Sequence, residues 1–287
     1  DGGFYWHSEP AGGNKYKAFH WPGSPLAEDY DEMPFLQLMR KQAFAIRGLP
    51  APAIPAPAPP KLLPIADAGA ISWQGSVGAT GYAVERAARP NGPWTVVGEN
   101  VDESFTQYRP QFSDETVTKG KWFYRVRAKN AAGVSAPSNV IGPVRVAQVT
   151  CVDELADFTK VHSHAGELGI ESRDCRSAME DAHRAGGRAG SALVYRMASP
   201  ITAARVFVFF PKEIADVKFS VSADGLAFQP AATQRNELPF NLGDYGYWRR
   251  AIYEVKPASK KDEFLKIEFT GAAQISRVEI QRAADAK

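Results

Sequence analysis

The hydrophobic and polar positions predict one amphipathic helix near the start of the chain. Leu36, Met39, Ala43 and Ile46 are spaced three, four and three residues apart, which places them on one face of a helix over residues 31–47. An isolated helix of about fifteen residues is marginal in water, so we expect this one to pack on a partner surface.

A linker follows the helix. Gly48 and Pro50 end the helix, and residues 49–61 contain prolines that are nearly all separated by alanine. Such a run favours polyproline II, a stiff spacer of about 3.1 Å per residue.

The remaining chain predicts antiparallel β-structure in two blocks. Short alternating runs fall at 70–73, 81–86, 94–97 and 122–128, and then at 192–196, 205–210, 217–221, 250–255, 264–269 and 277–280. Asp224 and Gly225 mark a hairpin in the second block. The predicted fold class is therefore mainly β, with a sandwich over 62–146 and another over 150–287.

Composition narrows the classes of partner. The 287 residues are 44% hydrophobic and 23% charged, as in a globular protein of several domains. No apolar run reaches the roughly 18 residues of a membrane helix. The net charge of +2 comes from 34 basic and 32 acidic groups, evenly mixed, which argues against a nucleic-acid or membrane partner.

The first segment carries a family resemblance. The runs at 2–9, 16–23 and 30–32, with the helix after them, resemble the last loop and helix of a (β/α)8 glycoside hydrolase of the bacterial β-mannanase-like branch of family five. The resemblance implies that residues 1–48 close a catalytic barrel missing from this chain. It also implies a secreted protein, extracellular or periplasmic, that acts on mannan or a related β-glycan.

The same resemblance argues against catalysis by this chain alone. A retaining glycosidase needs two carboxylates about 5 Å apart, and in that family they lie at the ends of the fourth and seventh strands, upstream of residue 1. We therefore expect no catalytic residue here. Trp6, His7 and Glu9 are candidates for the rim of the cleft, with simple packing of that loop as the alternative.

Both β-blocks resemble known modules. The first, over 62–146, is similar to fibronectin type III through Trp73, Tyr82, Tyr124, Val126 and the run 130–139. The second, over 150–287, resembles galactose-binding-like jelly rolls through the runs 221–228 and 277–280. These resemblances imply a spacer followed by a carbohydrate-binding domain.

One loop of the second block has the composition of a sugar site. Sugars stack their C–H faces on aromatic rings and bind polar groups through their hydroxyls. The candidate residues are Asn241, Asp244, Tyr245, Tyr247, Trp248 and Arg249. The alternative is that the rings pack beneath a long loop as anchors.

The two cysteines suggest a covalent link. Cys151 and Cys175 are predicted to form a disulfide that closes a loop of about 25 residues, worth roughly 3 kcal/mol. Two buried free thiols are the alternative.

Two further clusters are of a kind that binds metals. Asp153, Glu154 and Asp157 offer oxygen ligands for a structural calcium, although such a cluster is generic. His162 and His164 share one face of a strand, and Cys175 with His183 would complete a site, but ordinary polar roles are the alternative.

Three functions remain open from the sequence. The chain is the non-catalytic accessory region of a polysaccharide-degrading hydrolase, with a spacer and a carbohydrate-binding module. Alternatively, it is part of an active endo-β-glycanase or β-mannosidase-type enzyme whose barrel lies upstream or on another chain, or it is a purely structural stalk.

Overall fold

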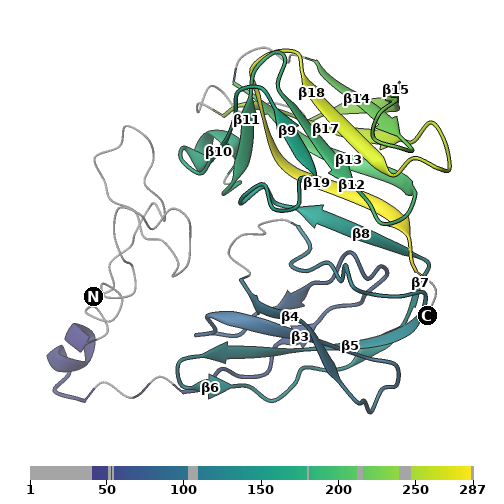
Figure 1. The fold of residues 1–287 in the computed structure, drawn as a ribbon. Coiled ribbons are helices and arrows are strands. Elements are labelled where there is room, and N and C mark those ends of the chain that lie inside the picture. The colour runs from purple at the N-terminus through teal and green to yellow at the C-terminus, as the bar shows by residue number, and fades with distance from the viewer. Residues whose placement is uncertain are drawn as a thin grey trace. The chain divides into compact units, whose positions relative to one another are not determined.

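The computed structural model, drawn in Figure 1, describes residues 41–50, 53, 55–102, 109–179, 181–211, 216–238 and 247–285. Most of the predicted barrel end, including Trp6, His7 and Glu9, lies outside these residues. The described residues are mainly β-strand, which confirms the predicted fold class. Within them, no helix is long and apolar enough to cross a membrane.

The chain divides into two compact units. Among the described residues, the first takes in those up to residue 66 and those within 70–112 and 121–144. The second consists of residues 67–69, 113–120 and 145–287. The predicted domain limits at 62–146 and 150–287 stay predictions.

A glycine ends the predicted helix. Residues 41–46 are helical, and Gly48 follows with a φ of 67°. The N–H of Leu49 donates to the carbonyl of Phe44 at 3.0 Å, and the N–H of Gly48 donates to the carbonyl of Ala45 at 2.9 Å. This pair of bonds is a Schellman motif, for which glycine is favoured because it adopts positive φ without strain.

The described part of the proline-rich linker packs on the first unit. Pro57 and Pro60 are buried. Asn130 Nδ2 donates a hydrogen bond to the carbonyl of Pro55 at 2.9 Å. The described residues 55–60 therefore bury proline rings against the first unit, and the predicted role of residues 49–61 as a linker stays a prediction.

The first unit holds a two-stranded sheet and a five-stranded sheet. Its strands are β1 (Lys61–Leu62), β2 (Trp73–Gln74), β3 (Gly81–Ala87), β4 (Thr95–Val101), β5 (Gly120–Asn130), β6 (Gly133–Val134) and β7 (Ile141–Val146). β1 pairs with β2, and the larger sheet has the order β4-β3-β5-β6 with β7 also on β5. The rings of Trp73 and Tyr82 lie 5.2 Å apart, and Tyr124 and Val126 are buried with them. These four side chains therefore belong to the core of the first unit.

The second unit is a sandwich of two antiparallel sheets. Its elements are β8 (Gln148–Asp153), β9 (Ser163–Ala165), β10 (Leu168–Glu171), the 3₁₀ helix η3 (Cys175–Ala178), β11 (Arg184–Gly187), β12 (Ala192–Arg196), β13 (Ile201–Phe210), β14 (Val217–Ser222), β15 (Gln229–Pro230), β16 (Ala232–Glu237), β17 (Arg249–Lys256), β18 (Phe264–Phe269) and β19 (Ala273–Ala283). One sheet has the order β10-β11-β19-β13-β17-β16 with β8 also on β19. The other has the order β15-β14-β18-β12-β9.

Alternation along the strands separates an inner from an outer face. On β12, Leu193 and Tyr195 are buried in the core, whereas Val194 and Arg196 between and beside them are not. Arg196 is paired in register with Phe264 of β18. The outer face of this sheet therefore presents Val194, Arg196 and Phe264 next to one another.

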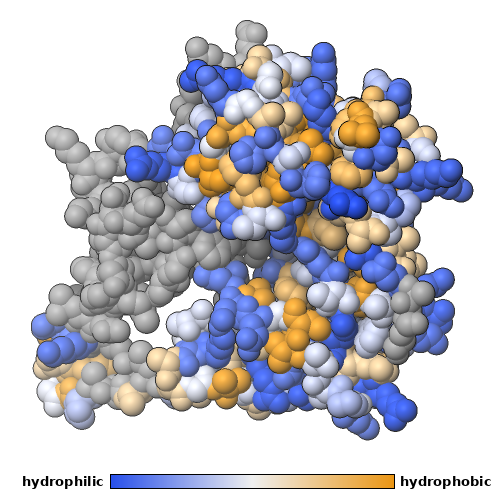
Figure 2. All heavy atoms as spheres, in the orientation of Figure 1, coloured by the Kyte–Doolittle hydropathy of each residue, from blue (hydrophilic) through white to orange (hydrophobic). Residues whose placement is uncertain are grey.

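On the face drawn in Figure 2, hydrophobic and hydrophilic residues are interspersed. Some large apolar side chains are nevertheless strongly exposed, among them Leu226, which is 87% exposed in the second unit. Leu226 lies in the predicted hairpin, where the loop between β14 and β15 spans residues 223–228.

The predicted disulfide is wrong, because Cys151 and Cys175 are both free thiols. Along β19, Cys151 lies opposite Ile280, whereas Ala185 lies opposite Ile275. The two partner positions on β19, Ile280 and Ile275, are five residues apart, which corresponds to about 17 Å along the strand. Cys175 belongs to the Ala185 end, where its sulfur is 3.5 Å from the guanidinium of Arg184.

Candidate functional site

The predicted aromatic loop connects β16 to β17. Asn241, Asp244 and Tyr245 lie outside the described residues. Tyr247 and Trp248 are partly buried just before β17, and Arg249 is exposed at its first position, in register with Phe210 of β13. Three of the six predicted sugar-binding residues are therefore placed by the structure.

Trp248 lines a surface depression of about 210 Å³, which we call the Trp248 cleft. Its other principal lining residues are Glu167, Gly186, Gly187, Arg188 and Gln274. The backbone N–H of Trp248 donates to the carbonyl of Ser177 in η3 at 2.7 Å. This bond fixes the chain at the point where the indole enters the cleft.

Two glycines line one wall of the cleft. Gly186 and Gly187 belong to β11. A Cβ atom on Gly187 would lie 2.9 Å from the ring of Phe269, closer than real contacts allow. Glycine is therefore needed here for the strand to lie against that ring.

Charged side chains stand at the rim of the cleft. Arg188 and Glu167 form an ion pair at 3.4 Å, and both side chains are 79% exposed. An exposed pair of this kind contributes about 0–1 kcal/mol. Both groups are therefore available to exchange their mutual contact for contacts with a ligand.

The amide of Gln274 is held in one orientation. Arg184 Nε donates to Gln274 Oε1 at 2.6 Å. Because a guanidinium only donates, the oxygen of the amide must face Arg184, and its NH2 group takes the other side. The NH2 group of Gln274 is thus oriented away from Arg184, and Gln274 lines the cleft together with Trp248.

Arg184 itself is a buried arginine that organises the surrounding segment, with an exposed fraction of 1%. Nη1 donates to the carbonyl of Asp181 at 2.6 Å, and Nη2 donates to the carbonyl of Arg173. The segment closed by these bonds contains η3, whose Ser177 carbonyl binds Trp248. One guanidinium therefore helps to position both Gln274 and Trp248.

The predicted histidine metal site is not assembled. His183 Nδ1 lies 2.9 Å from the hydroxyl of Ser172, and burial lowers the pKa of His183. His164 stacks on Phe158 at 4.6 Å. Within the ranges that the structure describes, no three histidine, cysteine or acidic side chains converge as metal ligands.

The predicted calcium ligands are engaged separately. Asp153 Oδ1 accepts from the N–H of Leu155, and its Oδ2 accepts from the hydroxyl of Tyr195, both at 2.9 Å. Glu154 is paired with Arg277. Asp157 Oδ1 accepts from Thr159, an interaction that lowers the pKa of Asp157. These carboxylates do not form a common site.

No family model matches the chain. Among solved structures, the chain is similar to the CBM51-2 domain in complex with GlcNAc and the INT domains of Clostridium perfringens ZmpB, with 14% identity and a TM-score of 0.27, covering 60% of this chain and 39% of that one. It is also similar to the M60 catalytic domain with the CBM51-1 and CBM51-2 domains of the same protein, with 12% identity and a TM-score of 0.28, covering 67% and 21%.

A third similar structure belongs to the carbohydrate-binding modules of the β-sandwich superfamily. It has 10% identity and a TM-score of 0.22, covering 79% of this chain and 97% of that one. The chain spans well under two thirds of the ZmpB structures it matches. Similarity at this level transfers neither a ligand nor an activity.

Proposed function

We propose that the second unit is a carbohydrate-binding module and that the Trp248 cleft holds one sugar ring. The observation that carries this proposal is that the partly buried Trp248 and Gln274, whose amide is oriented by Arg184, line the same depression. An indole offers a flat apolar surface for the C–H face of a sugar, and the amide NH2 binds a hydroxyl or carbonyl oxygen of the same ring.

The rest of the cleft fits this role. Arg188 supplies donors and Glu167 supplies acceptors at the rim, so that both kinds of hydroxyl interaction are available. Gly186 and Gly187 of β11 line the cleft together with Trp248. Tyr247 and Arg249, adjacent in the chain, extend the proposed site along the start of β17.

The wider context remains a proposal based on the family resemblance. In it, this chain is the C-terminal accessory region of a secreted, β-mannanase-like hydrolase. The first unit is a fibronectin type III spacer, and the polysaccharide is mannan or a related β-glycan. Catalysis then belongs to the missing barrel, and the module holds the enzyme on its polymer.

Affinity electrophoresis with the full chain in gels containing mannan, cellulose derivatives or xylan tests the proposal. Trp248→Ala is expected to weaken retention by about tenfold or more, because tryptophan anchors are the largest single contributors in such sites. Trp94→Ala, which removes a partly buried indole from the first unit, serves as the matched control. Equal retention of Trp248→Ala and wild type would rule out the cleft, and no retention on any polymer would favour the structural stalk.

A further inference from the structure

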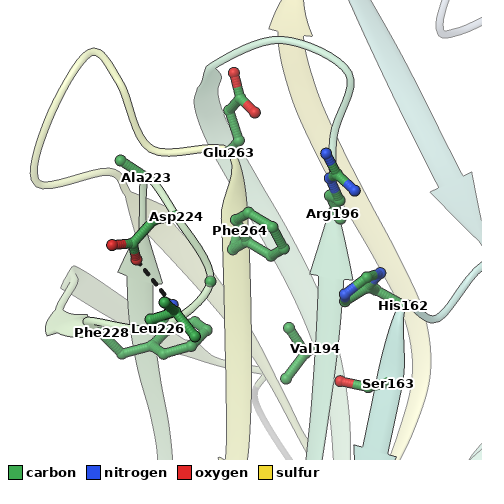
Figure 3. A pocket seen from close by; sticks show the side chains of 11 residues that line it. His162, Ser163, Val194, Arg196, Ala223, Asp224, Leu226, Phe228, Glu263 and Phe264 are labelled. Atoms are coloured by element: carbon green, nitrogen blue, oxygen red, sulfur yellow. Dashed lines mark hydrogen bonds between the residues drawn. The ribbon is translucent and has the colours of Figure 1, made fainter.

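A second depression lies on the outer face of the sheet that contains β12, β14 and β18 (Figure 3). Its volume of about 450 Å³ is within the usual range of ligand clefts, roughly 300–1,000 Å³. We call it the His162 groove. Its lining residues include His162, Arg196, Asp224, Leu226, Phe228, Glu263 and Phe264. It shares no lining residue with the Trp248 cleft.

The floor of the groove is an aromatic ring locked in place. Phe264 points outward from β18, yet only 8% of it is exposed. The ring of His162 meets it edge-on at 5.5 Å, and a Cβ atom on Gly225 would lie 2.9 Å from it. Gly225 also has a φ of 76°. The loop and the ring are therefore packed as closely as a glycine permits.

The hairpin loop forms a second, rigid wall. Asp224 Oδ1 accepts hydrogen bonds from the N–H of Leu226 at 2.8 Å and of Ala227 at 3.0 Å. The hydroxyl of Ser222 donates to the same oxygen at 2.9 Å. These bonds hold Leu226, 87% exposed, beside Phe228 on the wall of the groove. The apolar surface of the wall is thus present before any ligand arrives.

Polar groups of both kinds flank this apolar surface. The guanidinium of Arg196 lies 5.5 Å from the ring centre of Phe264. Figure 3 shows Arg196 and His162 on one side of Phe264, Asp224 on the other, and Glu263 at the upper rim. Donors and acceptors therefore surround an apolar centre.

The charges of the groove favour a neutral ligand. Its lining carries the guanidinium of Arg196 and the carboxylates of Asp224 and Glu263. Two carboxylates oppose the binding of a phosphate, a sulfate or a uronic acid, and the guanidinium opposes a cation. A sugar ring with an apolar C–H face and a hydroxyl edge matches both the floor and the rim.

We propose that the His162 groove is a second carbohydrate site, which takes a neutral hexose unit of the polymer that the Trp248 cleft binds. The proposal rests on the carbohydrate-binding function of the second unit. The C–H face of the sugar lies against Leu226 and Phe228, and its hydroxyls bind Arg196 and Glu263. Two sites on one unit raise the avidity for a long polymer above the affinity for a short oligosaccharide.

Nuclear magnetic resonance of the full chain distinguishes the two sites. The ring C–H of His162 reports on the groove, and the indole N–H of Trp248 reports on the cleft. Mannohexaose and cellohexaose are titrated separately to about 10 mM, which covers the millimolar dissociation constants of weak single sites. We expect both signals to move, each with its own saturation curve.

Substitutions test whether the sugar binding reported by His162 takes place in the groove. Glu263→Ala should weaken the affinity reported by His162 by about fivefold to tenfold and leave the affinity reported by Trp248 unchanged. Glu254→Ala, an exposed carboxylate on β17, is the matched control and should change neither. Unchanged affinity at His162 in Glu263→Ala would overturn the proposal.

The remaining outcomes separate this proposal from the function on which it rests. Movement at Trp248 without movement at His162 would reject the groove and leave the module in place. If neither the His162 signal nor the Trp248 signal moved with either sugar, both the groove proposal and the proposed carbohydrate-binding function would be rejected. A response at His162 to oligogalacturonate alone would overturn the assignment to neutral sugars.

Discussion

Arg184 Nε donates a hydrogen bond to Gln274 Oε1 at 2.6 Å, although 90 residues separate the two in the chain. The donor is buried, and the acceptor lies at the surface of the Trp248 cleft. The bond thus couples the interior of the unit to the orientation of a group in the proposed sugar site.

Two substitutions of Gln274 separate its roles in stability and in binding. In Gln274→Glu, the carboxylate still accepts from Arg184, so the free energy of unfolding should not fall. The cleft loses its NH2 donor, and affinity for oligosaccharide should fall by about fivefold to tenfold. Denaturant unfolding and calorimetric titration measure the two effects.

Gln274→Leu should impair both properties. It leaves Arg184 Nε without this acceptor, at a cost of about 1–3 kcal/mol, and it removes the same donor from the cleft. If Gln274→Glu bound sugar as tightly as wild type while Gln274→Leu did not, the NH2 group would have no role in binding.

A substitution at Gly187 tests how closely β11 must pack against the opposite sheet. Gly187→Ala places a methyl group 2.9 Å from the ring of Phe269 and should destabilise the second unit by about 1–3 kcal/mol. Gly186→Ala is the control, because its nearest contact would be 3.8 Å. Thermal unfolding should show a lower midpoint for the first variant alone, and equal midpoints would contradict the packing described.

The alternation of hydrophobic and polar residues predicted those strands that bury one face. The predicted runs at 192–196 and 264–269 coincide with β12 and β18, because their core residues recur at every second position. β16, by contrast, has six exposed residues and no such pattern, and neither β16 nor the glycine-containing β11 is among the predicted runs. The resemblance to a fibronectin type III domain stays a prediction.

The candidate site was only partly visible in the sequence. Trp248 was predicted from its aromatic surroundings, a signal local to one loop. Gln274, Arg188 and Glu167 join it through the register of β10, β11 and β19, which no local pattern encodes. In the sequence, a buried arginine such as Arg184 cannot be distinguished from a surface arginine, because its hydrogen-bond partners are known only from the fold.

Tyr195 and Asp153 make stability depend on pH. Burial raises the pKa of Asp153 above its ordinary 3.8, and the hydrogen bond from Tyr195 opposes this rise. The pKa of Asp153 is higher in the folded state than in the unfolded state. Its contribution to the free energy of unfolding is therefore fully present below pH 3.8 and declines as the pH rises through the folded pKa.

Tyr195→Phe should strengthen that decline. It removes a donor to the carboxylate, so the pKa of Asp153 rises further and the ionised form costs more. We expect a loss of about 1–3 kcal/mol near about pH 7 and a smaller loss near about pH 4. Urea unfolding at both values measures it. In the Asp153→Asn background the difference between the two pH values should disappear, and its persistence there would assign it to another group.

Asp224 should make stability depend on pH in the opposite direction to Asp153. Hydrogen bonds from the N–H groups of Ala227 and Leu226 and from the hydroxyl of Ser222 lower the pKa of Asp224 from 3.8 to about 2. A depressed folded pKa means that the stabilisation is present above 3.8 and is lost as the pH falls through about 2. Asp224→Asn removes the ionisation. The gap in unfolding free energy between wild type and this variant should therefore be constant at neutral pH and narrow steadily in acid. A gap that stays constant down to the acid limit would show that the charge of Asp224 does not hold the β14–β15 hairpin.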